Sequence, residues 1–296
     1  MIINAKCAFE EIEQVKDRTM KKGIKDLEIQ LLKNIHNMPE YEIKKILRET
    51  EANINIIHLR LYDGDSVNFS DFSLPLEEYF DKIYTGFIFA QKVADIQNNG
   101  RIGVVLHLDT GIKDTQNFMK NMIFMGRIKN LLENFPSTEI LIENVMLVEE
   151  NGYKNAPEGK GGCFYEPCAV AKMLNSYFKT DKFKTVLDIC HAMSSIRISK
   201  ELFNRNDTLD DFFREYKDTI GLIHLAWCEK YGYDNDHGLP FDKSRADILK
   251  EIMDLYDKYQ YDCQITLEVY EDDFNDAKNC QETYRQLVKI IGLKED

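Results

Sequence analysis

Long apolar runs are missing from this sequence, and glycine and proline are scarce, with 15 and 6 among 296 residues. Few glycines and prolines exclude collagen-like and Pro/Gly-rich low-complexity chains. No stretch approaches the roughly 18 apolar residues of a membrane-spanning helix, and polar residues interrupt the apolar start of the chain after three residues. We therefore expect no membrane span and no signal peptide.

Paired cysteines are also missing. The seven cysteines are odd in number and include no CxxC pair, which argues against a disulfide framework and against a structural zinc ribbon. The reducing cytoplasm is the expected compartment. Cys163, Cys168 and Cys190 are candidates for thiol ligands, but a buried, small apolar role is commoner for cysteine.

Positive charge is in deficit. The 38 basic residues are outnumbered by 51 acidic ones, which gives a net charge of −13 and a pI near 5.0. A protein that binds nucleic acid through its overall field leans basic, so nucleic acid is a disfavoured partner. A local basic groove or bound metal cations can still reverse the sign where it matters.

Short apolar, β-branched runs alternate with segments of helical periodicity along the whole chain. The expected strands are Ile2–Ala8, Asp26–Leu31, Ile54–Leu61, Gly103–Leu108, Glu139–Val145, Thr185–Cys190, Ile220–Ala226 and Gln264–Tyr270. The expected helices are Glu10–Lys22, Pro39–Glu51, Leu76–Gln97, Asp114–Asn134, Pro167–Phe178, Leu209–Tyr216, Asp242–Lys258 and Asp273–Ile290. Strict alternation indicates a parallel sheet covered by helices. Eight units predict an α/β protein, a single (β/α)8 TIM barrel domain over residues 1–296, with an open doubly wound sheet as the rival.

Polar side chains stand where these strands end, which is where the chemistry of such a barrel lies. They are Glu28, Gln30, His58, Arg60, His107, Asp109, Glu143, Asn144, Asp188, His191, His224 and Glu268, with His237 in the loop after the seventh strand. Five of the six histidines, all but His36, lie at or just past a strand end. Because an unpaired carboxylate is costly in an apolar strand, and because imidazole and carboxylate together bind divalent metals, we expect a metal site.

Five motifs, LIENV, LDICHA, IHLAW, DNDHG and ITLEV, follow one another in an order and spacing that resembles the xylose isomerase-like TIM barrel superfamily over the whole chain. That superfamily includes sugar isomerases, ketose 3-epimerases and endonuclease IV. The resemblance implies an enzyme with one to three divalent ions per chain, which are Zn²⁺, Mn²⁺ or Co²⁺.

Similarity to the epimerase branch implies one divalent ion held by four side chains, Glu143, Asp188, His224 and Glu268. The two glutamates are then the catalytic residues, which transfer a proton next to a carbonyl through an enediolate. Glu28, in the stretch GIKDLEI, is similar to the second strand of sugar isomerases. The substrate contacts expected with it are Arg60, His191, Trp227 and Lys160.

Similarity to the endonuclease IV branch implies two further zinc sites. The second would use His58, His107 and the shared Glu143. The third would use His191 and an Asp-x-His pair, of which His237 is present while the Asp position falls on Asn235.

The loops depart from endonuclease IV. The sequence has HLDTG where that family shows HPG, and ENVMLVEE where it shows Asn-Thr-Ala-Gly. No Arg- and aromatic-rich loop follows the second expected strand. Loops decide the substrate on this fold, so we favour a sugar or sugar phosphate isomerase or epimerase with a small-molecule substrate. The alternatives are a zinc-dependent endonuclease acting on abasic DNA and a non-catalytic binding barrel, and the oligomeric state stays open.

Overall fold

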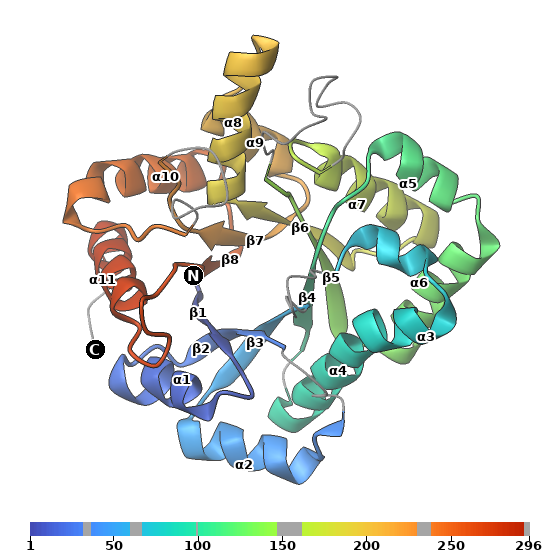
Figure 1. Cartoon of the computed structure of the whole chain (residues 1–296), viewed down its shortest axis with the longest axis horizontal. Coiled ribbons are helices and arrows are strands. Elements are labelled where there is room, and N and C mark those ends of the chain that lie inside the picture. Colours follow the sequence, from blue (N-terminus) through green and yellow to red (C-terminus); the bar gives the residue numbers. More distant parts are fainter. Residues whose placement is uncertain (32–36, 60–66, 99, 147–161, 230–237, 293–296) are drawn as a thin grey trace.

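Eight parallel strands close into a barrel in sequence order, with β8 paired to β1 (Figure 1). The computed structural model describes residues 1–31, 37–59, 67–98, 100–146, 162–229 and 238–292. The strands are β1 (Ile3–Ala8), β2 (Asp26–Gln30), β3 (Asn53–His58), β4 (Ile102–His107), β5 (Thr138–Glu143), β6 (Phe183–Asp188), β7 (Ile220–Leu225) and β8 (Gln264–Leu267). The predicted (β/α)8 barrel is confirmed.

Helices surround the barrel and connect its strands (Figure 1). They are α1 (Ile12–Lys16) continued by the π-helical η1 (Asp17–Lys21), α2 (Glu40–Thr50), η3 (Phe69–Ser73), α3 (Leu76–Tyr79), η4 (Phe80–Tyr84), α4 (Thr85–Gln97), α5 (Ile112–Phe118), α6 (Met122–Asn134), α7 (Glu166–Phe178), α8 (Ile189–Phe203), α9 (Leu209–Tyr216), η6 (Lys243–Arg245), α10 (Ala246–Lys258) and α11 (Lys278–Ile291). None of the described helices combines the length and apolar character that crossing a membrane requires.

Several predicted elements have other bounds in the structure; the strand expected over Gln264–Tyr270, for example, ends at Leu267. Two of the differences have a clear local cause. The helix expected over Asp114–Asn134 is two helices, because the Asn121 side chain accepts a hydrogen bond from Ile123 N at 2.8 Å and starts α6 afresh. The strand expected to reach Cys190 ends at Asp188, whose carboxylate accepts a hydrogen bond from His191 N at 2.6 Å. This N-cap begins α8, a helix that the sequence analysis did not expect.

An apolar layer fills the inside of the barrel. It consists of Ile56, Val105, Leu141, Val186 and Leu222, one from each strand β3 to β7. Gly103 makes room for it, since a Cβ there would lie 2.5 Å from Leu141 Cδ1. Side chains two residues apart on a strand share a face. The residue two positions after each member therefore also faces inward, nearer the carboxyl ends of the strands.

Side-chain amides fasten two helices to strands. Gln97 of α4 accepts from Ile54 N at 2.8 Å and donates to Ile54 O at 2.9 Å. Asn175 of α7 makes the same pair of bonds with Phe183, at 3.0 and 2.8 Å. Each amide satisfies a backbone donor and acceptor that would otherwise lack partners at a strand start.

Candidate metal centre

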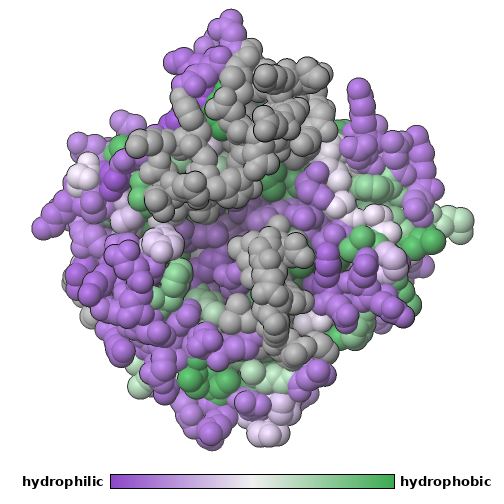
Figure 2. All heavy atoms as spheres, in the orientation of Figure 1, coloured by the Kyte–Doolittle hydropathy of each residue, from purple (hydrophilic) through white to green (hydrophobic). Residues whose placement is uncertain are grey.

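The register of the barrel brings the predicted residues to one mouth. The inner-facing positions above the apolar layer are His58, His107, Glu143, Asp188 and His224. His107 pairs with Glu143 across β4 and β5, and Asp188 pairs with His224 across β6 and β7. In the orientation of Figure 1, hydrophilic residues gather at the centre of the molecular face (Figure 2). The fold thus collects imidazoles and carboxylates above an apolar floor.

Glu143 lies among four histidines. Its Oε1 is 3.2 Å from His224 Nδ1 and 3.5 Å from His191 Nδ1. Its Oε2 is 3.2 Å from His58 Nε2 and 3.3 Å from His107 Nε2. Burial raises the pKa of Glu143, but His224 and His107 lower it more, so the pKa lies well below the usual value. Glu143 is therefore an anionic carboxylate that four imidazoles approach.

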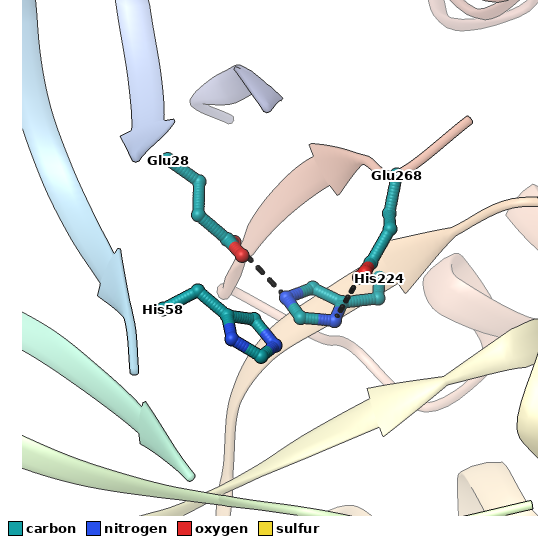
Figure 3. A group of neighbouring side chains, drawn as sticks. All are labelled: Glu28, His58, His224 and Glu268. Carbon is teal, nitrogen blue, oxygen red and sulfur yellow. Dashed lines mark hydrogen bonds and ion pairs between the residues drawn. The ribbon is translucent and has the colours of Figure 1, made fainter. Parts of the chain in front are cut away.

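His224 is fully buried between carboxylates (Figure 3). Its Nε2 is 3.0 Å from Glu28 Oε2, and its Nδ1 is 2.5 Å from Glu268 Oε2 and 3.8 Å from Asp188 Oδ2. Burial lowers the pKa of His224, but the charges of Glu268, Glu28 and Glu143 together raise it well above the usual value. The His224 imidazole thus contacts carboxylates through both of its ring nitrogens.

The pKa values of the other histidines are shifted in different directions. Burial lowers the pKa of His58, and the nearby Lys6 ammonium lowers it further. Burial also lowers the pKa of His191. The pKa of His107 is raised, because Glu143 outweighs the effect of burial. His58 and His191 are thus favoured as neutral imidazoles, the form that binds metals.

Three groups of side chains each offer ligand atoms within 4.8 Å of one another. The first group contains the expected four residues, Glu143, Asp188, His224 and Glu268. The second contains His58, His107 and Glu143, which matches the expected second site. The third was not expected and contains Glu28, His58, His224 and Glu268. Carboxylate oxygens and imidazole nitrogens suit Zn²⁺ or Mn²⁺, and carboxylates as buried as Glu28, Glu143 and Asp188 need a compensating cation. The residues present therefore fit a divalent ion.

Lys6 of β1 is a charged residue of the mouth that the sequence analysis missed. Its Nζ lies 2.5 Å from Glu268 Oε1 and 3.5 Å from Glu28 Oε1, and its side chain is 12% exposed. Burial lowers the pKa of Lys6, but Glu268, Glu28 and Glu143 raise it above the usual value. The available signal was a lysine inside the otherwise weakly polar run INAKCA.

Asn144 fastens the Asp188 ligand in place. Its Oδ1 accepts from Asp188 N at 2.7 Å, and its Nδ2 donates to Asp188 O at 3.1 Å. Asn144 O lies 2.8 Å from His191 Nδ1. Asn144, the residue that follows Glu143, thus positions both Asp188 and His191.

The expected substrate contacts are placed unevenly. Glu28 lies in the third ligand group. Trp227 contacts Phe241 and the Arg197 guanidinium and lines a pocket of about 480 Å³ between α8 and α10. Arg60, Lys160, Asn235 and His237 lie outside the described residues. All seven cysteines are free and buried, and none belongs to the three groups.

Solved structures with the same architecture are known, although no family model and no curated protein sequence matches this chain. The 3-keto-D-glucoside 4-epimerase from E. coli has a TM-score of 0.59 and 12% identity, over 99% of both chains. Endonuclease IV from Thermus thermophilus has a TM-score of 0.57 and 15% identity, over 97% of this chain and 98% of that one. The IolI protein with a bound zinc atom has a TM-score of 0.61 and 11% identity, over 99% and 98%. These are xylose isomerase-like TIM barrels, so the resemblance drawn from the motifs is confirmed at the level of the fold.

Proposed function

We propose that this chain is a divalent-metal-dependent isomerase or epimerase of a sugar or sugar phosphate. The observation that carries the proposal is the accessibility of Glu268. Among the carboxylates described at the mouth, the Glu268 side chain is 17% exposed, while those of Glu28, Glu143 and Asp188 are at most 1% exposed. Glu268 also belongs to the first ligand group. A substrate can therefore reach Glu268 at the place where an ion would hold the carbonyl.

The metal ligands in this proposal are Glu143, Asp188, His224 and Glu268. A bound divalent ion polarises a carbonyl and stabilises the negative charge that develops on its oxygen. Glu143, first expected to transfer protons, is better suited to a purely ligating role, because its side chain is only 1% exposed and is out of reach of a substrate.

Glu268 would remove the proton from the carbon next to the carbonyl, and the electron pair of the C–H bond would move to the carbonyl oxygen to give an enediolate. Return of the same proton to the neighbouring carbon, with transfer of the hydroxyl proton from the oxygen that becomes the new carbonyl to the oxygen of the old one, completes an isomerisation with a single carbon base. Epimerisation needs a second group on the other face of the substrate. His107 and His191, whose side chains are 15% and 12% exposed, are the candidates.

Proton exchange in deuterated water tests this proposal without knowledge of the product. The protein, supplied with Mn²⁺, Co²⁺ or Zn²⁺, is incubated with D-fructose, D-tagatose, D-ribulose and their phosphates, and loss of the C1 or C3 proton is followed by NMR. E268Q should reduce exchange by roughly 100-fold or more. E139Q is the matched control, since Glu139 lies on β5 at the other end of the barrel and pairs with Arg101 at 2.9 Å. Exchange unaffected by E268Q would contradict the proposal.

The second ligand group favours another candidate, an endonuclease IV-like phosphodiesterase. The second group consists of His58, His107 and Glu143, and it has Glu143 in common with the first group. Two metal ions held close together suit in-line displacement at phosphorus. The net charge of −13 opposes DNA as the substrate. We expect no binding to a duplex with an abasic site at about 0.15 M salt. Metal-dependent nicking of that duplex, lost in the H58A/H107A variant together with one ion per chain, would replace the first proposal.

The expected partner and cellular compartment follow from the same proposal. A sugar-like small molecule is the proposed partner. The seven free, buried cysteines fit a reducing compartment such as the cytoplasm.

A further inference from the structure

Lys6 stands against the third ligand group. By the register of β1 and β2 it pairs with Glu28, and its ammonium contacts one oxygen of Glu28 and one of Glu268. The remaining oxygen of each carboxylate faces a different nitrogen of His224 (Figure 3). Two carboxylates thus connect one lysine to one imidazole.

The two nitrogens of His224 face different surroundings. Nδ1 faces Glu143, Asp188 and Glu268, which are the other members of the first ligand group. Nε2 faces Glu28 at 3.0 Å. A metal-binding histidine commonly donates its other N–H to a carboxylate, which fixes the tautomer and the ring orientation. Glu28 is placed to accept that hydrogen bond while Nδ1 binds the ion.

The charges at the mouth explain why Glu28 accepts a hydrogen bond from His224 and does not bind a metal ion itself. The mouth collects four carboxylates, and a single divalent ion in the first group neutralises two of the negative charges. Lys6 neutralises a third at the point where Glu28 and Glu268 approach each other. With the ammonium present, a second divalent ion at the third group would meet a positive charge beside two of its ligands. Without the ammonium, the same group would be an open, anionic site.

We propose that Lys6 is a built-in cation that takes the place of a metal ion at Glu28, His58, His224 and Glu268, and so leaves Glu28 to orient His224. This inference rests on the proposed metal site of Glu143, Asp188, His224 and Glu268. It gives Lys6 a positioning role, and it reassigns Glu28 from a substrate contact to a partner of a metal ligand.

Metal stoichiometry tests the role of Lys6. Wild type and K6M are dialysed against Zn²⁺ and then against metal-free buffer, and bound zinc is measured by elemental analysis. K6M should hold one more ion per chain than wild type, and K6M/E28Q should return to the wild-type number. K184M is the matched control, because Lys184 lies near the start of β6, at the opposite end of the barrel. It should leave the number unchanged.

A second variant tests Glu28 without touching the lysine. E28Q in the wild-type background should keep the wild-type number of ions and bind them roughly 10–100-fold more weakly, as loss of an orienting carboxylate does. Circular dichroism confirms the fold of each variant. An unchanged ion count in folded K6M, or the loss of a whole ion in E28Q, overturns the inference and leaves the first ligand group standing. A wild-type protein that binds no ion overturns the proposed metal site and this inference with it.

Discussion

Replacement of Asn144 by alanine should affect both the stability of the fold and the candidate metal centre. Asn144 is fully buried, and its amide makes two hydrogen bonds to the backbone of Asp188. Asp188 is at once the last residue of β6, the N-cap of α8 and a member of the first ligand group. Loss of the amide should therefore cost stability and also loosen one ligand.

The size of the stability loss follows from the two backbone groups left behind. Each buried donor or acceptor without a partner costs about 1–3 kcal/mol, so N144A should lower the free energy of unfolding by roughly 2–6 kcal/mol. Because Asp188 would be less well oriented, zinc affinity should fall by roughly 10–100-fold. Urea denaturation of chelator-treated protein measures the first quantity, and competition with a chromogenic chelator measures the second.

Asn175 offers a control at the other end of the same strand. It makes the same two bonds with Phe183, the first residue of β6, and it is only half-buried. N175A should destabilise the protein by less than N144A and should leave zinc affinity unchanged. Equal losses of zinc affinity in both variants would show that general destabilisation explains the effect. A stability change in N144A below about 0.5 kcal/mol would refute the energetic reasoning itself.

Three further outcomes are expected. G162A should lower the free energy of unfolding by at least about 1–3 kcal/mol, measured in urea, because Gly162 has φ +91° and the Leu108 carbonyl stands where a Cβ would be; unchanged stability would contradict this. D17A should cost roughly 3–5 kcal/mol without changing zinc binding, because it leaves the fully buried Arg18 without its carboxylate partner at 3.0 Å; a loss below about 1 kcal/mol would count against it. Hydrogen bonds from Lys22 and Lys278 lower the pKa of Asp276 to about 2, below the value near 3.9 of an unfolded chain, so its contribution is present above about pH 4 and is lost as the pH falls towards 2. The stability gap between wild type and D276N should therefore shrink over that range in pH-dependent urea titrations, whereas a constant gap would exclude the mechanism.

The barrel and the first ligand group were predictable because both depend on patterns that sequence displays directly. Eight apolar runs alternate with helical periodicity, and parallel strands bring their carboxyl ends to one edge. Glu143 and Asp188 were expected near the carboxyl ends of their strands and are the last residues of β5 and β6, so their meeting follows from topology.

The remaining parts of the mouth depend on contacts that sequence does not display. Both faces of a barrel strand are buried, one by the interior and one by helices, so alternation does not say which way Lys6 points. Its neighbours Ala5 and Cys7 are buried as well. The start of α8 was missed for a related reason, because LDIC is as apolar as a strand and only the capping bond at Asp188 ends it.

The apolar layer inside the barrel has a kinetic consequence. Ile56, Val105, Leu141, Val186 and Leu222 lie two residues before the candidate ligands on five of the eight strands, so on the side of β3 to β7 this layer forms an apolar floor beneath the mouth. An ion in the first ligand group would rest on that floor, and a substrate would approach from the opening above it. If both bind in this way, the ion should enter first and leave last. A saturating substrate should accordingly slow the removal of the ion by a chelator, in proportion to the time that the substrate covers the opening.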